Sequence, residues 1–175
     1  EKKIIAMGPQ LTPHFDLKNK TLVWDEIRYD PRFQYRTYSV ICTYDLTTKH
    51  YKQLTRKSKY FSPTLSPDGK IIAAVKISKA NNFNLVLLDT ETGEEIRVLQ
   101  NPKNYFIQTP AFNETGTQLV YSVSANQGRN LAIYDLTENQ ATLLTDWDFK
   151  QSLRPAFFGK KIIYQSSYSG IDNIY

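Results

Sequence analysis

The stretch Ser62–Val75, with the sequence SPTLSPDGKIIAAV, decides how the rest of the chain is interpreted. A short strand at 63–65 is expected to run into the turn Ser66-Pro67-Asp68-Gly69, and an apolar strand to follow at 70–77. Pro67 presets φ near about −65°, Asp68 can accept hydrogen bonds from the turn's backbone, and Gly69 adopts a positive φ that other residues take only at a cost. The stretch therefore predicts two antiparallel strands joined by a tight turn.

Three other stretches have a similar pattern. TPHFDLKNKTLVW begins at Thr12, TPAFNETGTQLVY begins at Thr109 and RPAFFGKKIIYQ begins at Arg154. Between the prolines of these stretches the spacing is about 45–50 residues, which is typical of propellers, solenoids and other repeat arrays. In the first repeat the turn is expected at 16–19, and its last residue, Asn19, replaces Gly69 as the residue that next most readily adopts a left-handed conformation.

Each repeat contains four short strands, and no segment shows a convincing helical period. Four antiparallel strands repeated radially form the blades of a β-propeller. The sequence therefore predicts an all-β chain with about three full four-stranded blades and partial blades at both ends. The expected boundaries are a partial blade at 1–11 with one strand at 3–7, blades at 12–61, 62–107 and 108–151, and a partial blade at 152–175.

The second repeat, SPTLSPDGKIIAAV followed by NLVLLDTETGEEIRVL, resembles the PD40 (WD40-like) repeat of TolB-like propellers. That repeat has a Pro after Ser or Thr, an S-P-D-G turn, an apolar strand, and then a strand that ends in Asp before a hairpin. The resemblance covers nearly the whole chain, although the other repeats keep fewer of these residues. It implies an exported bacterial protein of the periplasm or cell envelope.

The resemblance also implies a propeller that closes with about six blades, which needs roughly 270–300 residues at this period. The sequence has 175 residues. An open arc of blades exposes apolar faces and strand edges. We therefore expect a fragment of a six-bladed propeller, whose remaining blades come from the same longer chain rather than from a second copy.

Composition and charge favour an ordinary protein surface. The net charge is +5, and 41% of the residues are hydrophobic. The basic residues are scattered, and the richest run, Arg56-Lys57-Ser58-Lys59, is short enough to be interpreted as a solvated loop. No apolar run has the length of a membrane span. We expect no nucleic-acid partner and no transmembrane segment.

No catalytic motif is visible in these residues, and two His and one Cys show no metal-ligand spacing. We expect no catalytic residue, no metal and no cofactor. Cys42 lies in an apolar strand and is expected to be a small buried side chain, and His14 is expected to pack in the core. Asp25 and Glu26 are interpreted as the exposed end of a strand.

Asp45, Asp89 and Asp135 recur at equivalent positions, each before a hairpin turn. An Asp side chain at such a position accepts hydrogen bonds from backbone N–H groups. Because these residues belong to separate blades, we expect them to stabilise turns rather than to share a metal.

The longer connections carry many aromatic and basic residues. In a blade, the connections from second to third strand, and from fourth strand to the next blade, lie on one side of the disc, called here the loop face. Aromatic and Arg side chains on loops are typical of binding hot spots, although some of them could instead fold back and cap the blades. The candidate binding residues are Arg28, Tyr29, Arg32, Phe33, Tyr35, Arg36, Tyr38, Tyr60, Phe61, Phe83, Tyr105, Phe106, Arg129, Trp147, Phe149 and Tyr168.

These patterns favour a non-catalytic module that binds a protein or peptide through the loop face. Two alternatives remain. Similar propellers precede the catalytic domain of prolyl-oligopeptidase-type serine peptidases and gate access to it. Loop aromatics also stack on sugar rings, which would suit a carbohydrate-binding propeller.

Overall fold

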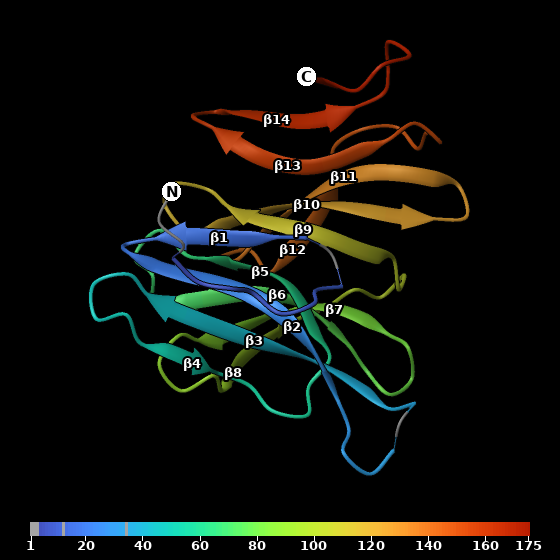
Figure 1. Cartoon of the computed structure of the whole chain (residues 1–175). Coiled ribbons are helices and arrows are strands. Elements are labelled where there is room, and N and C mark those ends of the chain that lie inside the picture. The colour runs from blue at the N-terminus through green and yellow to red at the C-terminus, as the bar shows by residue number, and fades with distance from the viewer. Residues whose placement is uncertain (1–3, 12, 34) are drawn as a thin grey trace.

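The computed structural model describes residues 4–11, 13–33 and 35–175, and within these ranges every regular element is a β-strand. The predicted all-β class is confirmed (Figure 1). The strands of the first two sheets are β1 (Phe15–Lys18), β2 (Thr21–Tyr29), β3 (Thr37–Asp45), β4 (Tyr51–Gln53), β5 (Tyr60–Leu65), β6 (Ile71–Ile77), β7 (Phe83–Asp89) and β8 (Glu95–Leu99). Those of the last two are β9 (Phe106–Phe112), β10 (Gln118–Ala125), β11 (Gly128–Asp135), β12 (Gln140–Leu143), β13 (Ser152–Phe158), β14 (Lys161–Ser166) and β15 (Asn173–Ile174).

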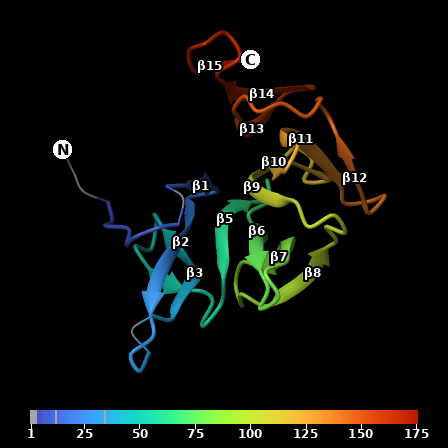
Figure 2. The same cartoon turned by 90° about the vertical axis from the view of Figure 1, so that its right-hand side faces the viewer.

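The described strands form four antiparallel sheets, each made of strands that are consecutive in the chain. Three sheets have four strands, β1–β4, β5–β8 and β9–β12, and the last has three, β13–β15. Figure 2 shows them side by side along an arc, with the first strand of each sheet on the inner side. These inner strands, β1, β5, β9 and β13, contact one another in chain order. The chain therefore forms part of a β-propeller, as predicted.

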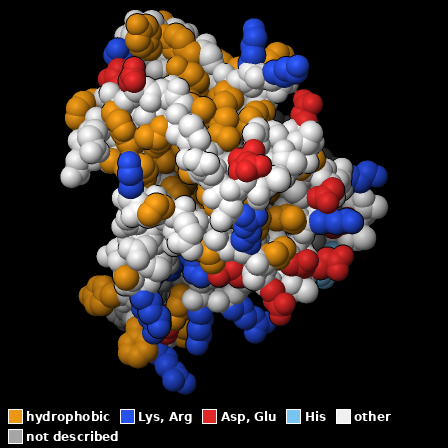
Figure 3. All heavy atoms as spheres, turned by 180° about the vertical axis from the view of Figure 1, so that it is seen from behind, with side chains coloured by type: hydrophobic (Ala, Val, Ile, Leu, Met, Phe, Trp, Pro, Cys, Tyr) orange, Lys and Arg blue, Asp and Glu red, His pale blue; other side chains and the backbone are white. Residues whose placement is uncertain are grey.

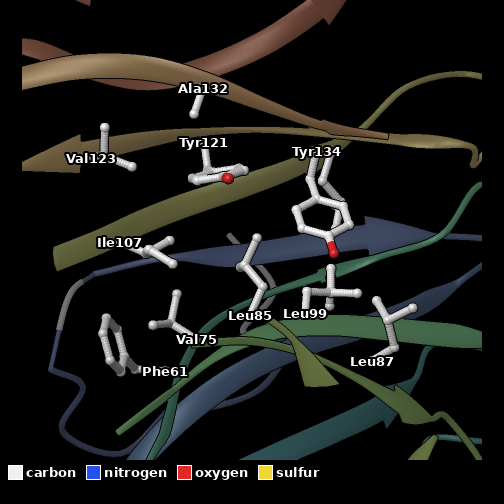
Figure 4. Close-up of a cluster of buried hydrophobic side chains, with 12 residues drawn as sticks. Phe61, Val75, Leu85, Leu87, Leu99, Ile107, Tyr121, Val123, Ala132 and Tyr134 are labelled. Carbon is white, nitrogen blue, oxygen red and sulfur yellow. The ribbon is translucent and has the colours of Figure 1, made fainter. Parts of the chain in front are cut away.

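The apolar core lies between neighbouring sheets. Figure 4 shows the cluster between the second and third sheets, where Val75 and Leu85 face Tyr121. A second cluster joins Val23 and Ile41 of the first sheet to strands of the second. The first three blades thus bury apolar faces against one another.

The turn that decides the fold forms as predicted. The Gly69 N–H donates to the Ser66 carbonyl over 2.9 Å, and Gly69 has a φ of +74°. The Asp68 carboxylate accepts the Lys70 N–H at 3.1 Å and the Ser66 hydroxyl at 2.6 Å. These bonds close the hairpin between β5 and β6.

The turn of the first repeat is shorter than predicted. Residues 16–18 belong to β1, and Lys18 pairs with Thr21, so that only Asn19 and Lys20 form the turn. Their φ values are 48° and 67°. Two consecutive positive φ values give the two-residue hairpin that matches strand twist, which explains why no four-residue turn is needed.

Each inner strand of the last three sheets contains a β-bulge at its proline. The pairing of β5 with β6, β9 with β10, and β13 with β14 shifts register there. The residues before the prolines, Ser62, Thr109 and Arg154, have φ values of 49°, 44° and 49°. A left-handed residue before proline is rare, and proline cannot donate a ladder hydrogen bond. The bulge recurs at the same position in all three strands, so it is a regular feature of the inner strand and bends it there.

The N-terminal segment is not the strand that the sequence predicts. Residues 4–11 have no strand, while Lys3 and Thr12 of the predicted first elements lie outside the described residues. The Pro9 carbonyl accepts the Ile27 N–H at 2.6 Å, and the Gly8 N–H donates to the Glu26 carboxylate at 3.0 Å. No strand forms here because Pro9 has no N–H to donate to a strand ladder. The N–H groups of Gly8 and Leu11 donate instead to the side-chain carboxylates of Glu26 and Asp25.

Asp25 and Glu26 are buried, which corrects the expectation that they are exposed. Their exposed fractions are 0% and 3%. Glu26 accepts the Trp24 indole N–H at 2.7 Å and pairs with the Arg28 guanidinium. Asp25 accepts the Ser62 N–H of the second sheet at 3.1 Å. Burial raises the pKa of Asp25, because the low-dielectric interior disfavours the ionised carboxylate.

The turn predicts a clear difference between two substitutions at one position. Gly69→Val should lower the free energy of unfolding by about 1–2 kcal/mol, since a β-branched residue at positive φ is strained. Gly69→Asn should cost less, because Asn19 already adopts this conformation in the first repeat. Urea unfolding measures both, and equal losses would contradict the left-handed assignment.

The buried carboxylate predicts a pH-dependent substitution effect. The raised pKa of Asp25 means that the folded state binds its proton more tightly than the unfolded state, whose pKa is about 3.9. The cost of burying the ionised form is therefore absent below that value and grows as pH rises through the folded pKa.

Asp25→Asn removes this titration. Relative to the parent, its free energy of unfolding should rise as pH increases from about 4 to 7. Urea unfolding of both proteins at several pH values measures the difference. If the difference in free energy of unfolding between variant and parent does not vary with pH, burial does not shift the pKa of Asp25.

Candidate functional site

An open groove of about 1320 Å³ lies on the loop face between the first and second sheets. Its walls are the β2–β3 connection, the β4–β5 connection and the end of the β6–β7 hairpin. The residues that line it are Arg32, Phe33, Tyr35, Arg36, Thr37, Tyr38, Arg56, Lys57, Ser58, Lys59, Tyr60, Lys76, Ile77, Ser78 and Lys79.

The groove is strongly basic. Seven of its lining residues are Lys or Arg, and none of those described is Asp or Glu. In Figure 3, Lys and Arg side chains gather at the lower end of the molecule, next to hydrophobic side chains. In the part of the chain that the structure describes, six of the seven cations form no ion pair: Arg32, Arg36, Arg56, Lys57, Lys59 and Lys79. The scattered positive charge of the sequence is therefore locally concentrated.

Asp30 organises the wall that comes from the first sheet. Its carboxylate accepts the Arg32 N–H at 2.9 Å and the Tyr38 hydroxyl at 2.8 Å. These hydrogen bonds lower the pKa of Asp30, and the one from the Arg32 N–H has the largest effect. The Arg36 guanidinium lies 5.3 Å from the centre of the Tyr38 ring, a cation–π distance. Asp30 thus bonds to the Arg32 backbone and the Tyr38 hydroxyl, while the guanidinium groups of Arg32 and Arg36 remain exposed.

Tyr60 and Lys76 form the opposite wall. The Lys76 ammonium lies 6.0 Å from the centre of the Tyr60 ring and pairs with Glu95 at 2.7 Å. Glu95 also accepts the Tyr60 hydroxyl at 3.2 Å. Burial, and then the charge of Glu95, raise the pKa of Tyr60 to about 12. Each wall therefore has the same arrangement of a tyrosine, a cation near its ring and a carboxylate on its hydroxyl.

The β4–β5 connection joins the two walls. The Ser39 N–H donates to the Ser58 carbonyl at 2.9 Å, and the Ser58 hydroxyl donates back to the Ser39 carbonyl at 2.9 Å. The Thr55 hydroxyl lies 2.9 Å from that of Ser58. This network fixes the run 56–59, which we interpreted as a solvated loop. Its cations are exposed, but they line the groove.

The sixteen candidate residues separate into three groups. Six line the groove: Arg32, Phe33, Tyr35, Arg36, Tyr38 and Tyr60. Five pack in the core between the second and third sheets: Phe61, Phe83, Tyr105, Phe106 and Trp147. The others lie elsewhere: Arg28, Tyr29, Arg129, Phe149 and Tyr168. Folding back, the alternative that the sequence left open, thus applies to the second group.

The remaining polar candidates stabilise the fold. Asp45, Asp89 and Asp135 each accept two backbone N–H groups of the following turn, as expected, and these bonds lower their pKa values. Cys42 is buried, and burial raises the pKa of its thiol to about 11. Among the described residues, no three His, Cys, Asp or Glu side chains lie close enough together to hold a metal ion.

Comparison with solved structures identifies the fold. TolB from Acinetobacter baumannii superimposes with a TM-score of 0.69 at 21% identity, over 87% of this chain and 38% of that one. The putative TolB from Agrobacterium tumefaciens gives a TM-score of 0.67 at 16% identity, over 86% of this chain and 56% of that one. This chain therefore has a TolB-like β-propeller fold.

The TolB-like fold is shared with propellers attached to enzymes. The β-propeller domain of the Trilobed protease from Pyrococcus furiosus, described as having an open velcro topology, gives a TM-score of 0.65 at 17% identity, over 93% of this chain and 52% of that one. The chain thus spans less than two thirds of each of these structures. No family model and no curated protein matches the sequence. Within the described residues, no helix is present that could span a membrane.

Proposed function

We propose that this chain is part of a non-catalytic module that binds a protein or peptide partner through its loop face. The observation that carries the proposal is the groove between the first two sheets, where exposed aromatic and Arg side chains converge on fixed walls. Such side chains dominate binding energies at interfaces, and walls that are ordered before binding lose little entropy. Export to the periplasm or cell envelope of a bacterium, which the TolB resemblance implies, belongs to the same proposal.

A second candidate is the propeller domain of a larger serine peptidase. The likeness to the propeller of the Pyrococcus furiosus protease favours it. In that case the groove would face substrates or a catalytic domain. A G-x-S-x-G motif elsewhere in the same polypeptide, with peptidase activity of the whole protein, would favour this candidate.

Carbohydrate binding is a third candidate, favoured by the exposed rings of Phe33 and Tyr35. Aromatic side chains stack on sugar rings, but such sites do not need six unpaired cations. A glycan array would distinguish this candidate from peptide binding.

The proposal predicts that groove substitutions weaken binding without unfolding the protein. Selection from a random-peptide display library should yield ligands, and Tyr35→Ala with Arg36→Ala should weaken their binding at least about tenfold. Tyr35 is fully exposed, so the thermal midpoint should not change.

The matched control is Phe158→Ala with Lys160→Ala, a ring at the end of β13 and a cation in the β13–β14 turn, on the opposite face. The control should bind selected peptides as the parent does. Ligands that both double variants retain equally would place the binding site outside the groove.

A further inference from the structure

We infer that the groove binds an acidic peptide segment that also carries aromatic residues. The inference deepens the proposed function and rests on it, because it names the chemistry of the partner. It follows from three features of the groove: its cations without an ion pair among the described residues, its two tyrosines and the carboxylates bonded to their hydroxyls.

The cations determine the charge of the partner. Arg32 and Arg36 come from the first sheet, Lys79 comes from the second, and the run 56–59 lies between them. Only Lys76, among the described lining cations, has a carboxylate partner. Positive charges from three segments at one groove repel one another, and acidic side chains of a partner would relieve this repulsion. Arg also binds carboxylates through two parallel hydrogen bonds.

The tyrosines indicate that the partner carries aromatic residues. Tyr38 and Tyr60 line opposite walls, and each is held by a hydrogen bond from its hydroxyl to a carboxylate. Phe33 and Tyr35 add exposed rings on the first-sheet side. Two hydrogen-bonded, partly buried rings and two exposed rings at a basic groove suit aromatic side chains placed between acidic ones.

The carboxylates favour a peptide over a nucleic acid. Asp30 and Glu95 each accept a hydrogen bond from a groove tyrosine, so a carboxylate lies at the hydroxyl end of each ring, and that of Glu95 also pairs with Lys76. A nucleic-acid strand carries a phosphate at every nucleotide, whereas a peptide can place acidic residues at the cations and uncharged residues next to the two carboxylates. The groove, at about 1320 Å³, also exceeds the usual size of about 300–1,000 Å³ for a small-molecule site.

Fluorescence anisotropy with defined probes tests the inference. The probes are a labelled peptide of three Glu-Glu-Tyr-Gly repeats, the same peptide with Gln for Glu, and oligothymidylate of similar length. The Glu peptide should bind at least about tenfold more tightly than the Gln peptide, and its affinity should fall as salt screens the charges. Display-selected ligands should likewise be rich in Asp, Glu and aromatic residues.

Two charge-reversal variants locate the binding site. Arg56→Glu with Lys59→Glu should weaken binding of the Glu peptide at least about tenfold. Lys160→Glu with Lys161→Glu makes the same change of net charge on the opposite face and should leave binding unchanged. Circular dichroism and thermal unfolding confirm that both variants fold.

The outcomes separate the two hypotheses. Equal affinity for the Glu and Gln peptides, with groove-dependent binding of display ligands, would overturn the acidic partner but leave the peptide-binding function intact. Tighter binding of oligothymidylate than of the Glu peptide would overturn the inference in favour of nucleic acid. Failure of both the probes and the display selection would overturn the proposed function itself.

Discussion

The hydrogen bond from the Ser62 N–H to the buried Asp25 carboxylate connects the first two blades at their most constrained point. Ser62 lies in the bulge of β5, and Asp25 lies in the middle of β2. The contact joins the two sheets together with the hydrogen bonds of Thr64 and Leu65 to Asp16, while Tyr60, two residues before Ser62, forms one wall of the groove. Because the groove is built from both sheets, its walls are held together by these contacts between the two blades.

The sequence predicts the local part of this architecture well. Pro67, Asp68 and Gly69 act through their own backbone preferences, so their turn forms as expected. The bulges were not predicted, since the residue before a proline normally avoids a left-handed conformation. The burial of Asp25 and Glu26 was missed because it depends on residues 4–11, which lie against β2 without forming a strand, and for Asp25 also on Ser62 of the second sheet.

About a third of the candidate binding residues line the groove, and the reason is physical. A pattern of aromatic residues locates a connection, but it does not tell whether a ring faces solvent or packs into the core, as Phe61 and Phe106 do. The run 56–59 was interpreted as a solvated loop because its neighbours in sequence gave no reason for another interpretation. The run 56–59 becomes part of a basic groove only because the fold places it beside Arg32 and Arg36, which are distant in the sequence.

The two ends of the blades, the end with the short turns and the end on the loop face, differ in the hydrogen bonds that stabilise them. One end has turns whose Asp, Gly and Asn residues satisfy the backbone and recur from repeat to repeat. In the first two blades the other end carries the groove, and most of its cations lie outside the strands with exposed side chains. The hydrogen bonds of the turns and the exposed cations of the groove thus belong to different segments of the blades. Substitutions of these exposed cations should therefore change the charge of the groove with little effect on the stability of the strands.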